Sequence, residues 1–573
     1  MLLSSVTGPS KPVLLELSIP ALLKLQASRH PERDAIVCSW TGVRYTYRGL
    51  HERSRQVARG LVALGIQPGD RVGILSGNCE RYVELFFAAS LVGAIVVVLN
   101  TTYTPIECVR AVEHSGCRVL FTSTSIGRRS MQSHLDLLAE MAQDGDSALS
   151  YLKHVVLIRH DQQPATDTIL SYDEFILKGD DISFAVVDKL ESSVDVYDIC
   201  NFQYTSGTTG APKATMLTHH NIVNNGFFIG ERMALTEVDR ICCPPPLFHC
   251  FGLVLGLLAC ISHGAALVLP GQTFEARSVL DALVAEKCTG LHGVPTMFVA
   301  ELEHLRSLPV APTIRLRTGI AAGSPVSRAL MEHLQQAFGF PELCITFGMT
   351  ETSPASFMTS VEDGVSEKLS TVGKILPHTS AKVVDTHGQV VPRGVPGELW
   401  VSGYNVQVGY FNEPHKTRDT VVKDDAGTVW IKTGDEVFLN DNGYCHITGR
   451  IKDVIIRGGE NIYPLEIEER LAQHEGVAQA AVVGLKDRKY GEVPAAFLEP
   501  HVKGASAARP TDTELQDWVG AVLGYHKVPV HIFWLGDCGV GESFPVTGSG
   551  KLKKNELRET GNRLIETAVA AVA

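Results

Sequence analysis

Strand-like and helix-like segments alternate through the first third of the chain, and this alternation constrains the fold more than any other feature. Residues 47–64 carry leucine and valine at helical spacing and end at a glycine, and residues 71–75 form an apolar run after a Pro-Gly-Asp turn. A helix over 81–92 and a β-rich run over 94–99 follow. Further strand-like runs lie at residues 119–122 and 155–158. Strands that alternate with helices form βα units with largely parallel sheets, so an α/β fold is expected.

Length and composition narrow the class of protein. At 573 residues the chain is too long for one hydrophobic core, so several lobes are expected. The formal net charge of −12 argues against a nucleic-acid partner, because no basic excess exists to neutralise phosphates. Apolar runs at 85–99 and 251–270 are too short or too interrupted to span a membrane. Thirteen cysteines without a CxxC pair fit a reduced compartment, and neither a secretory leader nor a C-terminal peroxisomal signal is seen, so the cytoplasm is the expected location by default.

A polar loop at residues 204–213, with the sequence YTSGTTGAPK, is the strongest candidate for a binding site. Glycine and proline exclude a helix or strand interior, while backbone N–H groups, hydroxyls and one lysine can hold a polyanion. The spacing differs from that of a Walker A loop. A solvated Ser/Thr/Gly linker is the alternative, and the apolar sequence upstream and the patterned segment downstream argue against it. The residues expected to bind phosphate are Thr205, Ser206, Gly207, Thr208, Thr209, Gly210 and Lys213.

This loop resembles the phosphate loop of the adenylate-forming (AMP-binding) superfamily, which includes acyl-CoA synthetases, firefly-type luciferases and adenylation domains. The one departure is Ala214, where the superfamily usually has glycine. The resemblance implies a large N-terminal domain of βα units (residues 1–449) with parallel sheets and a distorted β-barrel-like part. It also implies a hinge at 450–453 and a small mobile α+β C-terminal domain at 454–573. Family motifs follow in order from about residue 20 to residue 560.

The segment at residues 241–270 is expected to line a pocket. Three prolines end a strand, and a helix is expected to open near Phe248. Two glycines four residues apart lie on one face of that helix, where missing side chains leave a groove or allow close packing; for the glycines alone, close packing is the better interpretation. The resemblance implies that this segment lines the acyl site and that His249 gates the carboxylate, and the string is similar to the medium-chain acyl-CoA synthetase branch. The acyl-pocket residues are then His249, Phe251, Gly252, Gly256 and Ala322.

Two further loops follow apolar runs expected to be strands, at residues 314–320 and 343–345. Parallel sheets bind ligands beyond the carboxyl ends of their strands, so both loops are expected to face one crevice. The first loop contributes Gly323 and Ser324, and the second resembles the superfamily's YGxTE motif with phenylalanine in place of tyrosine. A helix cap is the alternative for its Thr-Glu pair. The expected roles are adenine contacts for Phe347 and Gly348, a phosphate contact for Thr350, and Mg²⁺ binding for Glu351.

The last motifs lie beyond residue 430. Asp435, in WIKTGD, matches the position that accepts the ribose hydroxyls, and an ordinary turn aspartate is the alternative. The resemblance implies that Arg450 joins it at the ribose, that Lys452 is the hinge residue, and that Lys551 bridges the carboxylate and the α-phosphate. Domain rotation would then withdraw the lysine and bring a glycine pair to the pantetheine of CoA. That pair is Gly458 and Gly459.

Together these motifs predict an AMP-forming acyl-CoA ligase, an acid–thiol ligase. It would activate an aliphatic, medium-chain carboxylic acid with ATP as acyl-AMP, release pyrophosphate, and transfer the acyl group to CoA, with Mg²⁺ as cofactor. The expected catalytic residues are Lys551, Glu351, Thr350 and His249. An acyl-AMP ligase that loads a carrier protein of a polyketide or nonribosomal peptide pathway is the alternative among enzymes. A nucleotide-binding pseudoenzyme is the alternative of another class, disfavoured because Lys551, Glu351 and Asp435 are all present.

Overall fold

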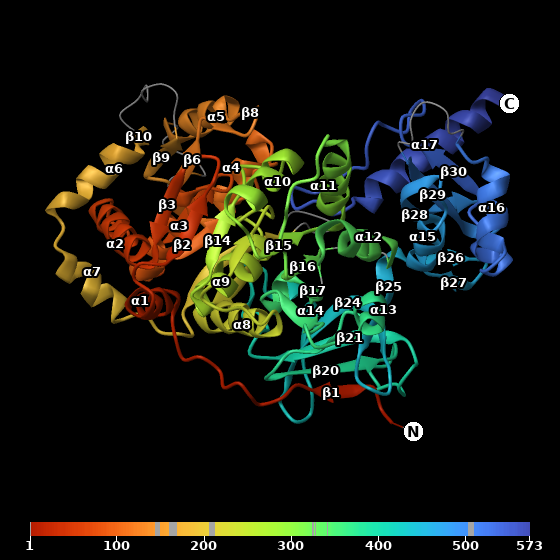
Figure 1. The fold of residues 1–573 in the computed structure, drawn as a ribbon, viewed down its shortest axis with the longest axis horizontal. Coiled ribbons are helices and arrows are strands. Elements are labelled where there is room, and N and C mark those ends of the chain that lie inside the picture. The colour runs from red at the N-terminus through yellow and green to blue at the C-terminus, as the bar shows by residue number, and fades with distance from the viewer. Residues whose placement is uncertain are drawn as a thin grey trace.

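Four large sheets organise the chain in the computed structural model, three of them up to residue 450 and one after it (Figure 1). The structure describes residues 2–143, 149, 151–159, 169–205, 213–323, 326, 328–340, 342–501 and 509–572. The predicted α/β class is confirmed, with a large N-terminal part and a smaller C-terminal part. The predicted site residues that lie outside the described ranges are Ser206, Gly207, Thr208, Thr209, Gly210 and Ser324.

An eight-stranded sheet carries the βα units that the alternating sequence predicted. Its first six strands are parallel to their neighbours, and the last two are antiparallel. The order is β10 (Ile169–Ser171), β9 (His154–Arg159), β6 (Cys117–Ser123), β4 (Arg71–Leu75), β5 (Ile95–Val98), β11 (Ile199–Thr205), β12 (Lys213–Thr218) and β22 (Gly409–Tyr410). The connecting helices are α2 (Tyr47–Ala63), α3 (Glu80–Leu91), α4 (Pro105–Ser115), α5 (Gln132–Gln143), α6 (Tyr172–Lys178) and α7 (Phe184–Glu191).

A nine-stranded sheet forms the second half of the large domain. Its central strands, from β17 to β2, are parallel. The order is β19 (Lys374–Ile375), β18 (Ala355–Met358), β17 (Glu342–Gly348), β16 (Thr318–Ala322), β15 (Gly290–Gly293), β13 (Arg240–Cys242), β14 (Ala266–Leu269), β2 (Asp34–Cys38) and β3 (Val43–Thr46). Its helices are α1 (Ile19–Arg29), α8 (His219–Arg232), the π-helix η2 (Phe251–Leu258), α9 (Ala259–His263), α10 (Ala276–Ala285), α11 (Pro295–Ser307), α12 (Arg328–Phe338) and α13 (Val365–Ser370).

One hydrophobic cluster receives side chains from one face of each of these two sheets. Helices α1, α2, α3, α8 and α9 and the π-helix η2 contribute to the same cluster, so they fill the layer between the sheets. The opposite face of the eight-stranded sheet packs against α4 and α5, and that of the nine-stranded sheet against α10, α11 and α12. Among the described residues, no helix combines the length and apolar character that crossing a bilayer requires.

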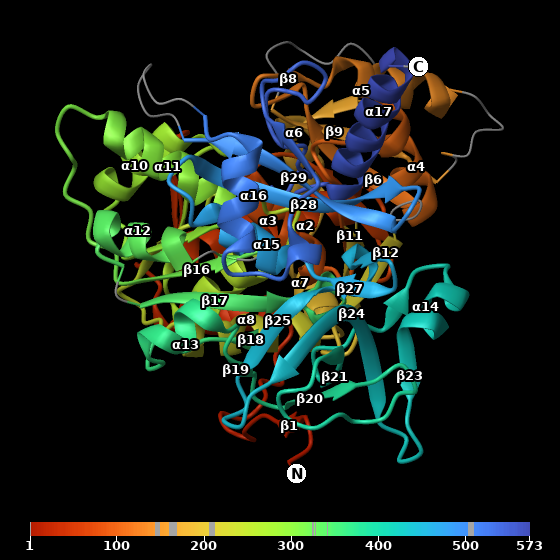
Figure 2. The same cartoon turned by 90° about the vertical axis from the view of Figure 1, so that its right-hand side faces the viewer.

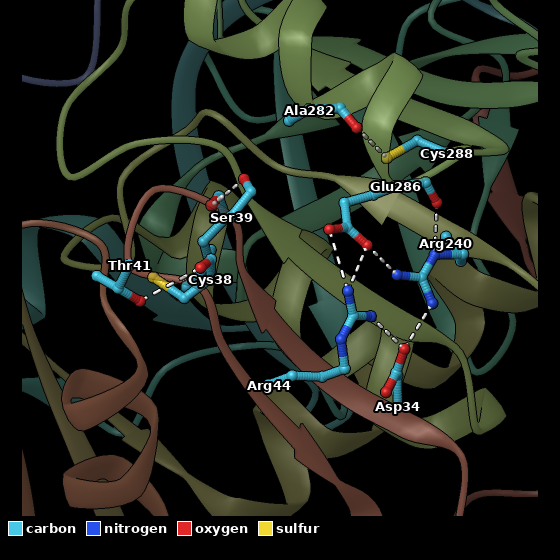
Figure 3. A network of polar contacts seen from close by, with 10 residues as sticks. Asp34, Cys38, Ser39, Thr41, Arg44, Arg240, Ala282, Glu286 and Cys288 are labelled. Carbon is cyan, nitrogen blue, oxygen red and sulfur yellow. Dashed lines mark hydrogen bonds and ion pairs between the residues drawn. The ribbon is translucent and has the colours of Figure 1, made fainter.

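Short-range signals explain why several of these elements begin and end where they do. Helix α4 starts with a capping box, in which Thr104 accepts from the N–H of Glu107 and the Glu107 carboxylate accepts from the N–H of Thr104. It ends at Gly116 with φ +63°, a left-handed conformation that glycine adopts without strain. Where β2, β3 and β13 meet the end of α10, four charged side chains form an ion-pair network (Figure 3). Its members are Asp34, Arg44, Arg240 and Glu286.

The part predicted to resemble a barrel is an open antiparallel sheet. Its path runs β1 (Ser5–Thr7), β20 (Thr379–Val384), β21 (Gly397–Gly403), β24 (Val429–Leu439) and β23 (Val421–Lys423), with β25 (Cys445–Arg450) also paired to β24. In the C-terminal part, β27 (Glu460–Ile462), β26 (Ile455–Arg457), β29 (Gly491–Pro500), β28 (Val477–Asp487) and β30 (His531–Trp534) form a five-stranded sheet. The remaining elements are the hairpin of β7 (Ser125–Ile126) and β8 (Arg129–Ser130), and helices α14 (Pro414–Thr420), α15 (Pro464–Ala472), α16 (Asp512–Gly520) and α17 (Lys554–Val572). Strand β25 leads into the C-terminal domain, where α15 lies against it (Figure 2).

Candidate active site

The predicted phosphate loop connects two antiparallel neighbours of the eight-stranded sheet. Thr205 ends β11 directly opposite Lys213, which begins β12, so the two ends of the loop lie side by side. The Lys213 ammonium lies 4.9 Å from the centroid of the Tyr410 ring. Tyr410 donates a 2.7 Å hydrogen bond to the Glu351 carboxylate. Tyr410 therefore contacts both Lys213, at the base of the phosphate loop, and Glu351, the predicted metal ligand.

Glu351 is held in place by β22 and the residues before it. It is 6% exposed, and its backbone carbonyl accepts from the Gln407 N–H at 2.9 Å. Sequence reasoning missed Tyr410, which lies in a glycine-punctuated stretch at residues 396–412. Burial, together with the neighbouring Glu351 carboxylate, raises the pKa of the Tyr410 hydroxyl, so that hydroxyl remains a donor at neutral pH.

Asp435 and Arg450 face each other across the pair β24 and β25. Their Cα atoms are in register, and Arg450 Nε lies 3.1 Å from Asp435 Oδ1. Asp435 is 5% exposed, whereas the Arg450 side chain is half exposed. Burial raises the pKa of Asp435, and the nearby cations Arg450 and Lys551 oppose that shift. A nearly buried carboxylate beside cations can accept hydrogen bonds from a ligand.

The loop that carries Lys551 docks on the large domain. A Cβ added to Gly550 would lie 2.9 Å from a Val294 methyl, and one added to Gly548 would lie 2.4 Å from the Asn100 side chain, so both glycines allow close approach. Lys551 Cε is 3.8 Å from the Cβ position of Gly323, whose φ of +91° turns the chain at the end of β16. The structure thus brings the lysine to the carboxyl end of β16.

The charges around Lys551 come from three residues of the predicted motifs, Arg450, Asp435 and Glu351. Burial and the Arg450 guanidinium lower its pKa, and the carboxylates Asp435 and Glu351 act in the opposite direction. Burial and the nearby positive charge of Lys551 together lower the pKa of His249 to about 3. His249 Nδ1 accepts from the N–H of Phe251 at 3.1 Å. His249 is therefore a neutral side chain at working pH and cannot serve as a standing cation.

The predicted groove over Gly252 and Gly256 is wrong. A Cβ on Gly252 would lie 2.4 Å from the Pro246 carbonyl oxygen, and a Cβ on Gly256 would lie 2.6 Å from Cys243 Sγ. Both missing side chains thus permit close packing, the interpretation that the glycines alone favoured. The helix also differs from the prediction, because it begins at Phe251 and is a π-helix rather than an α-helix over its first eight residues.

The remaining predicted residues lie in several places around this centre. Thr350 lies next to the acyl segment, with its hydroxyl 3.8 Å from Cys250 Sγ. Phe347 is half-buried against side chains of the antiparallel sheet, and its adenine contact stays a prediction. Lys452 lies in a short 3₁₀ turn, Ile451–Asp453, between β25 and β26, and its role as the hinge stays a prediction. Gly459 has φ +93° and open space where a side chain would lie. Ala322 is the last residue of β16, Gly348 is the last residue of β17, and Gly458 directly follows β26.

Comparison with known proteins identifies the family. The model described as AMP-binding enzyme matches residues 23–411, and the model of the AMP-binding enzyme C-terminal domain matches residues 466–551. The chain therefore belongs to the AMP-binding enzymes, the adenylate-forming family that includes acyl-CoA ligases.

Several of its relatives are named acyl-CoA ligases. The chain is 47% identical to acyl-CoA ligase sidI of Aspergillus fumigatus over 575 residues, covering all of this chain and 96% of that protein. It is 36% identical to a mitochondrial medium-chain acyl-CoA ligase, ACSF2, of Danio rerio, and the match covers 97% of this chain and 90% of that protein. Among solved structures, ATP-bound MatB from Rhodopseudomonas palustris superposes with a TM-score of 0.79 at 25% identity. The superposition covers 96% of this chain and 100% of MatB. The protein is thus an AMP-forming acyl-CoA ligase by family.

Proposed function

We propose that the protein activates an aliphatic, medium-chain carboxylic acid with ATP and ligates it to CoA. The observation that carries this proposal is the position of Lys551, which reaches from the C-terminal domain to Gly323 and lies among Asp435, Glu351 and Arg450. Similarity to a relative named a medium-chain acyl-CoA ligase supports the choice of acid. The cytoplasmic location stays a prediction.

In the first half-reaction, a carboxylate oxygen of the acid attacks the α-phosphorus of ATP and pyrophosphate leaves. Asp435 accepts hydrogen bonds from the ribose hydroxyls, while Arg450 holds its carboxylate in place. Lys551 contacts the acid's carboxylate and the α-phosphate, where negative charge crowds as the bond forms. The neutral His249 borders the carboxylate without adding charge to it.

The Glu351 carboxylate fits a role in binding Mg²⁺. Within the described part of the chain, no cluster of three or more His, Cys, Asp or Glu side chains could hold a metal by itself. A buried carboxylate with one oxygen engaged by Tyr410 suits an ion that takes most of its ligands from phosphate oxygens and water. Bound there, Mg²⁺ would neutralise charge on the phosphates of ATP.

In the second half-reaction, the CoA thiolate attacks the acyl carbon, AMP leaves, and the thiol proton passes to solvent. Rotation of the C-terminal domain at Lys452 withdraws Lys551 and brings the Gly458–Gly459 loop to the pantetheine. The left-handed φ values of both glycines, +59° and +93°, suit a bare backbone that borders a narrow tunnel.

A panel of straight-chain acids from C2 to C18 tests the proposal. ATP–pyrophosphate exchange should peak at medium chain length, and thioester should appear only when CoA is added. Exchange without thioester formation from CoA, but with transfer to a carrier protein's phosphopantetheine, would assign the protein to carrier loading instead. Tight ATP binding with no exchange for any acid would refute catalysis.

A further inference from the structure

Tyr410 lies between the base of the phosphate loop and the predicted metal ligand. It is 4% exposed and belongs to β22, where it pairs in antiparallel register with Thr215 of β12. Lys213 precedes Thr215 by two residues, so it lies on the same face of the sheet and diagonally across from Tyr410, within reach of a long side chain. The backbone N–H of Tyr410 donates to the Thr417 hydroxyl at 3.0 Å. Strand pairing thus places the tyrosine beside the lysine.

The hydroxyl of Tyr410 holds one oxygen of the Glu351 carboxylate. It donates to Oε1 at 2.7 Å, and the backbone N–H of Gln407 donates to the carbonyl oxygen of Glu351 at 2.9 Å. These two hydrogen bonds fix the glutamate at its backbone and at one end of its side chain. The second carboxylate oxygen, Oε2, has no hydrogen bond or ion pair among the described residues. One oxygen is therefore committed to the protein, and the other can bind a cation.

The ring of Tyr410 holds the Lys213 ammonium. Nζ lies 4.9 Å from the ring centroid, a cation–π contact, and in the described part of the chain it forms no ion pair with a carboxylate. The lysine and Glu351 therefore contact different parts of one side chain instead of each other. A cation–π contact is weak, whereas a buried ion pair is costly to break. Lys213 thus leaves the ring for a phosphate more readily than it would leave a buried carboxylate.

We propose that Tyr410 is a positioning residue that keeps Glu351 and Lys213 apart until ATP binds with Mg²⁺. Its hydroxyl holds one carboxylate oxygen and leaves the other to the metal, and its ring holds the ammonium until phosphate oxygens replace the ring. Without the tyrosine, the lysine and the glutamate would pair, because opposite charges attract strongly in a buried site. This assignment rests on the proposed function, in which Glu351 binds Mg²⁺, and extends it to a residue that acts through that ligand.

Three substitutions separate the parts of this arrangement. Tyr410→Phe removes the hydroxyl and keeps the ring beneath Lys213, whereas Tyr410→Leu removes both. Tyr404→Phe is the matched control, because it removes a tyrosine hydroxyl that accepts from Asn225 Nδ2 at 3.2 Å and contacts neither charged group. Thermal unfolding reports whether each variant folds.

The measurement is nucleotide binding without any acid, so it does not depend on which acid the protein uses. Calorimetry gives the dissociation constant of α,β-methylene-ATP in EDTA and in saturating Mg²⁺, and the ratio of the two constants reports how strongly metal and nucleotide binding are coupled. We expect this ratio to fall by about tenfold in Tyr410→Phe and to stay within about twofold in Tyr404→Phe. Binding in EDTA should change little in Tyr410→Phe, because the ring still holds the lysine.

Tyr410→Leu tests the separation of the two charges. We expect it to weaken binding in EDTA by about threefold or more, because the freed ammonium of Lys213 pairs with Glu351. Adding Glu351→Gln should then strengthen binding in EDTA more in the Tyr410→Leu background than in the wild type, since only there does the carboxylate hold the lysine. An equal gain in both backgrounds would overturn the proposal.

A merely structural role for Tyr410 gives a different result. It would weaken binding equally in EDTA and in Mg²⁺, so an unchanged ratio in Tyr410→Phe would overturn the proposal. A ratio of one in the wild type would overturn it as well, because Glu351 would then bind no metal. Absence of pyrophosphate exchange across the whole C2 to C18 panel would instead count against the proposed function, while the binding ratios would still decide the role of Tyr410.

Discussion

A hydrogen bond across the two domains provides the sharpest test of the proposed rotation. The Tyr463 hydroxyl, just before α15 in the C-terminal domain, donates to Glu436 Oε1 at 2.8 Å. Glu436 lies on β24 next to Asp435, and its other oxygen accepts from the Thr448 hydroxyl at 2.6 Å. Rotation at Lys452 would break the contact with Tyr463 and leave the contact with Thr448 in place, because Thr448 lies on β25, which pairs with the strand that carries Glu436.

The size of the effect follows from the chemistry of this contact. A hydrogen bond to a charged group contributes about 1.5–3 kcal/mol, and partial exposure favours the lower value. Tyr463→Phe should therefore shift the equilibrium between the two orientations by about tenfold, which corresponds to about 1.4 kcal/mol. Because each half-reaction uses one orientation, the ratio of the thioester-forming rate to the adenylating rate should rise by about the same factor.

The assay measures the two half-reactions separately. Pyrophosphate exchange reports adenylation, and thioester formation from preformed acyl-AMP and CoA reports the second step. Thr448→Val is the matched control, since it removes a hydrogen bond to the same carboxylate within one domain and should leave the ratio within about twofold. An unchanged ratio in Tyr463→Phe, or a parallel loss of both rates, would refute the reasoning.

Three further predictions follow from the site and its surroundings. Lys551→Ala should slow acyl-AMP formation by about 10² or more, the scale of losing one preorganised charge donor, while thioester formation from preformed acyl-AMP stays near the normal rate; equal slowing of both would contradict the rotation. Gly256→Leu should destabilise the protein by about 1–3 kcal/mol and reduce activity equally on acetate and octanoate, because the new side chain overpacks the contact with Cys243. A loss of activity on octanoate alone would instead support a groove for the acyl chain at Gly256. Burial lowers the pKa values of His219 and His249 to about 3, so between pH 6.5 and 3 the unfolded chain binds protons that the folded chain does not. The free energy of unfolding should fall by about 1.4 kcal/mol per pH unit for each histidine as the pH drops below 6.5, which urea titrations at pH 7, 6 and 5 would measure; a slope unchanged in His219→Gln would argue against that contribution.

Local structure and the order of motifs follow from the sequence itself. The helix expected at 47–64 is α2, the strand at 71–75 is β4, and the helix at 81–92 is α3 within one residue at each end. These elements depend on periodic apolar residues and on caps within a few residues, which are visible in the chain. The parallel-sheet rule also placed Gly323 and Glu351 at strand ends, where the structure has them.

Contacts between distant segments required the tertiary structure. Two glycines in an apolar helix favour close packing without excluding a groove, and the choice depends on which atoms their Cβ positions would meet, here Pro246 and Cys243. The same holds for the contact of Tyr410 with Glu351, which are 59 residues apart in the chain. Sequence periodicity assigns a residue to a face of its element, but the partner on the facing element is determined by how the elements pack.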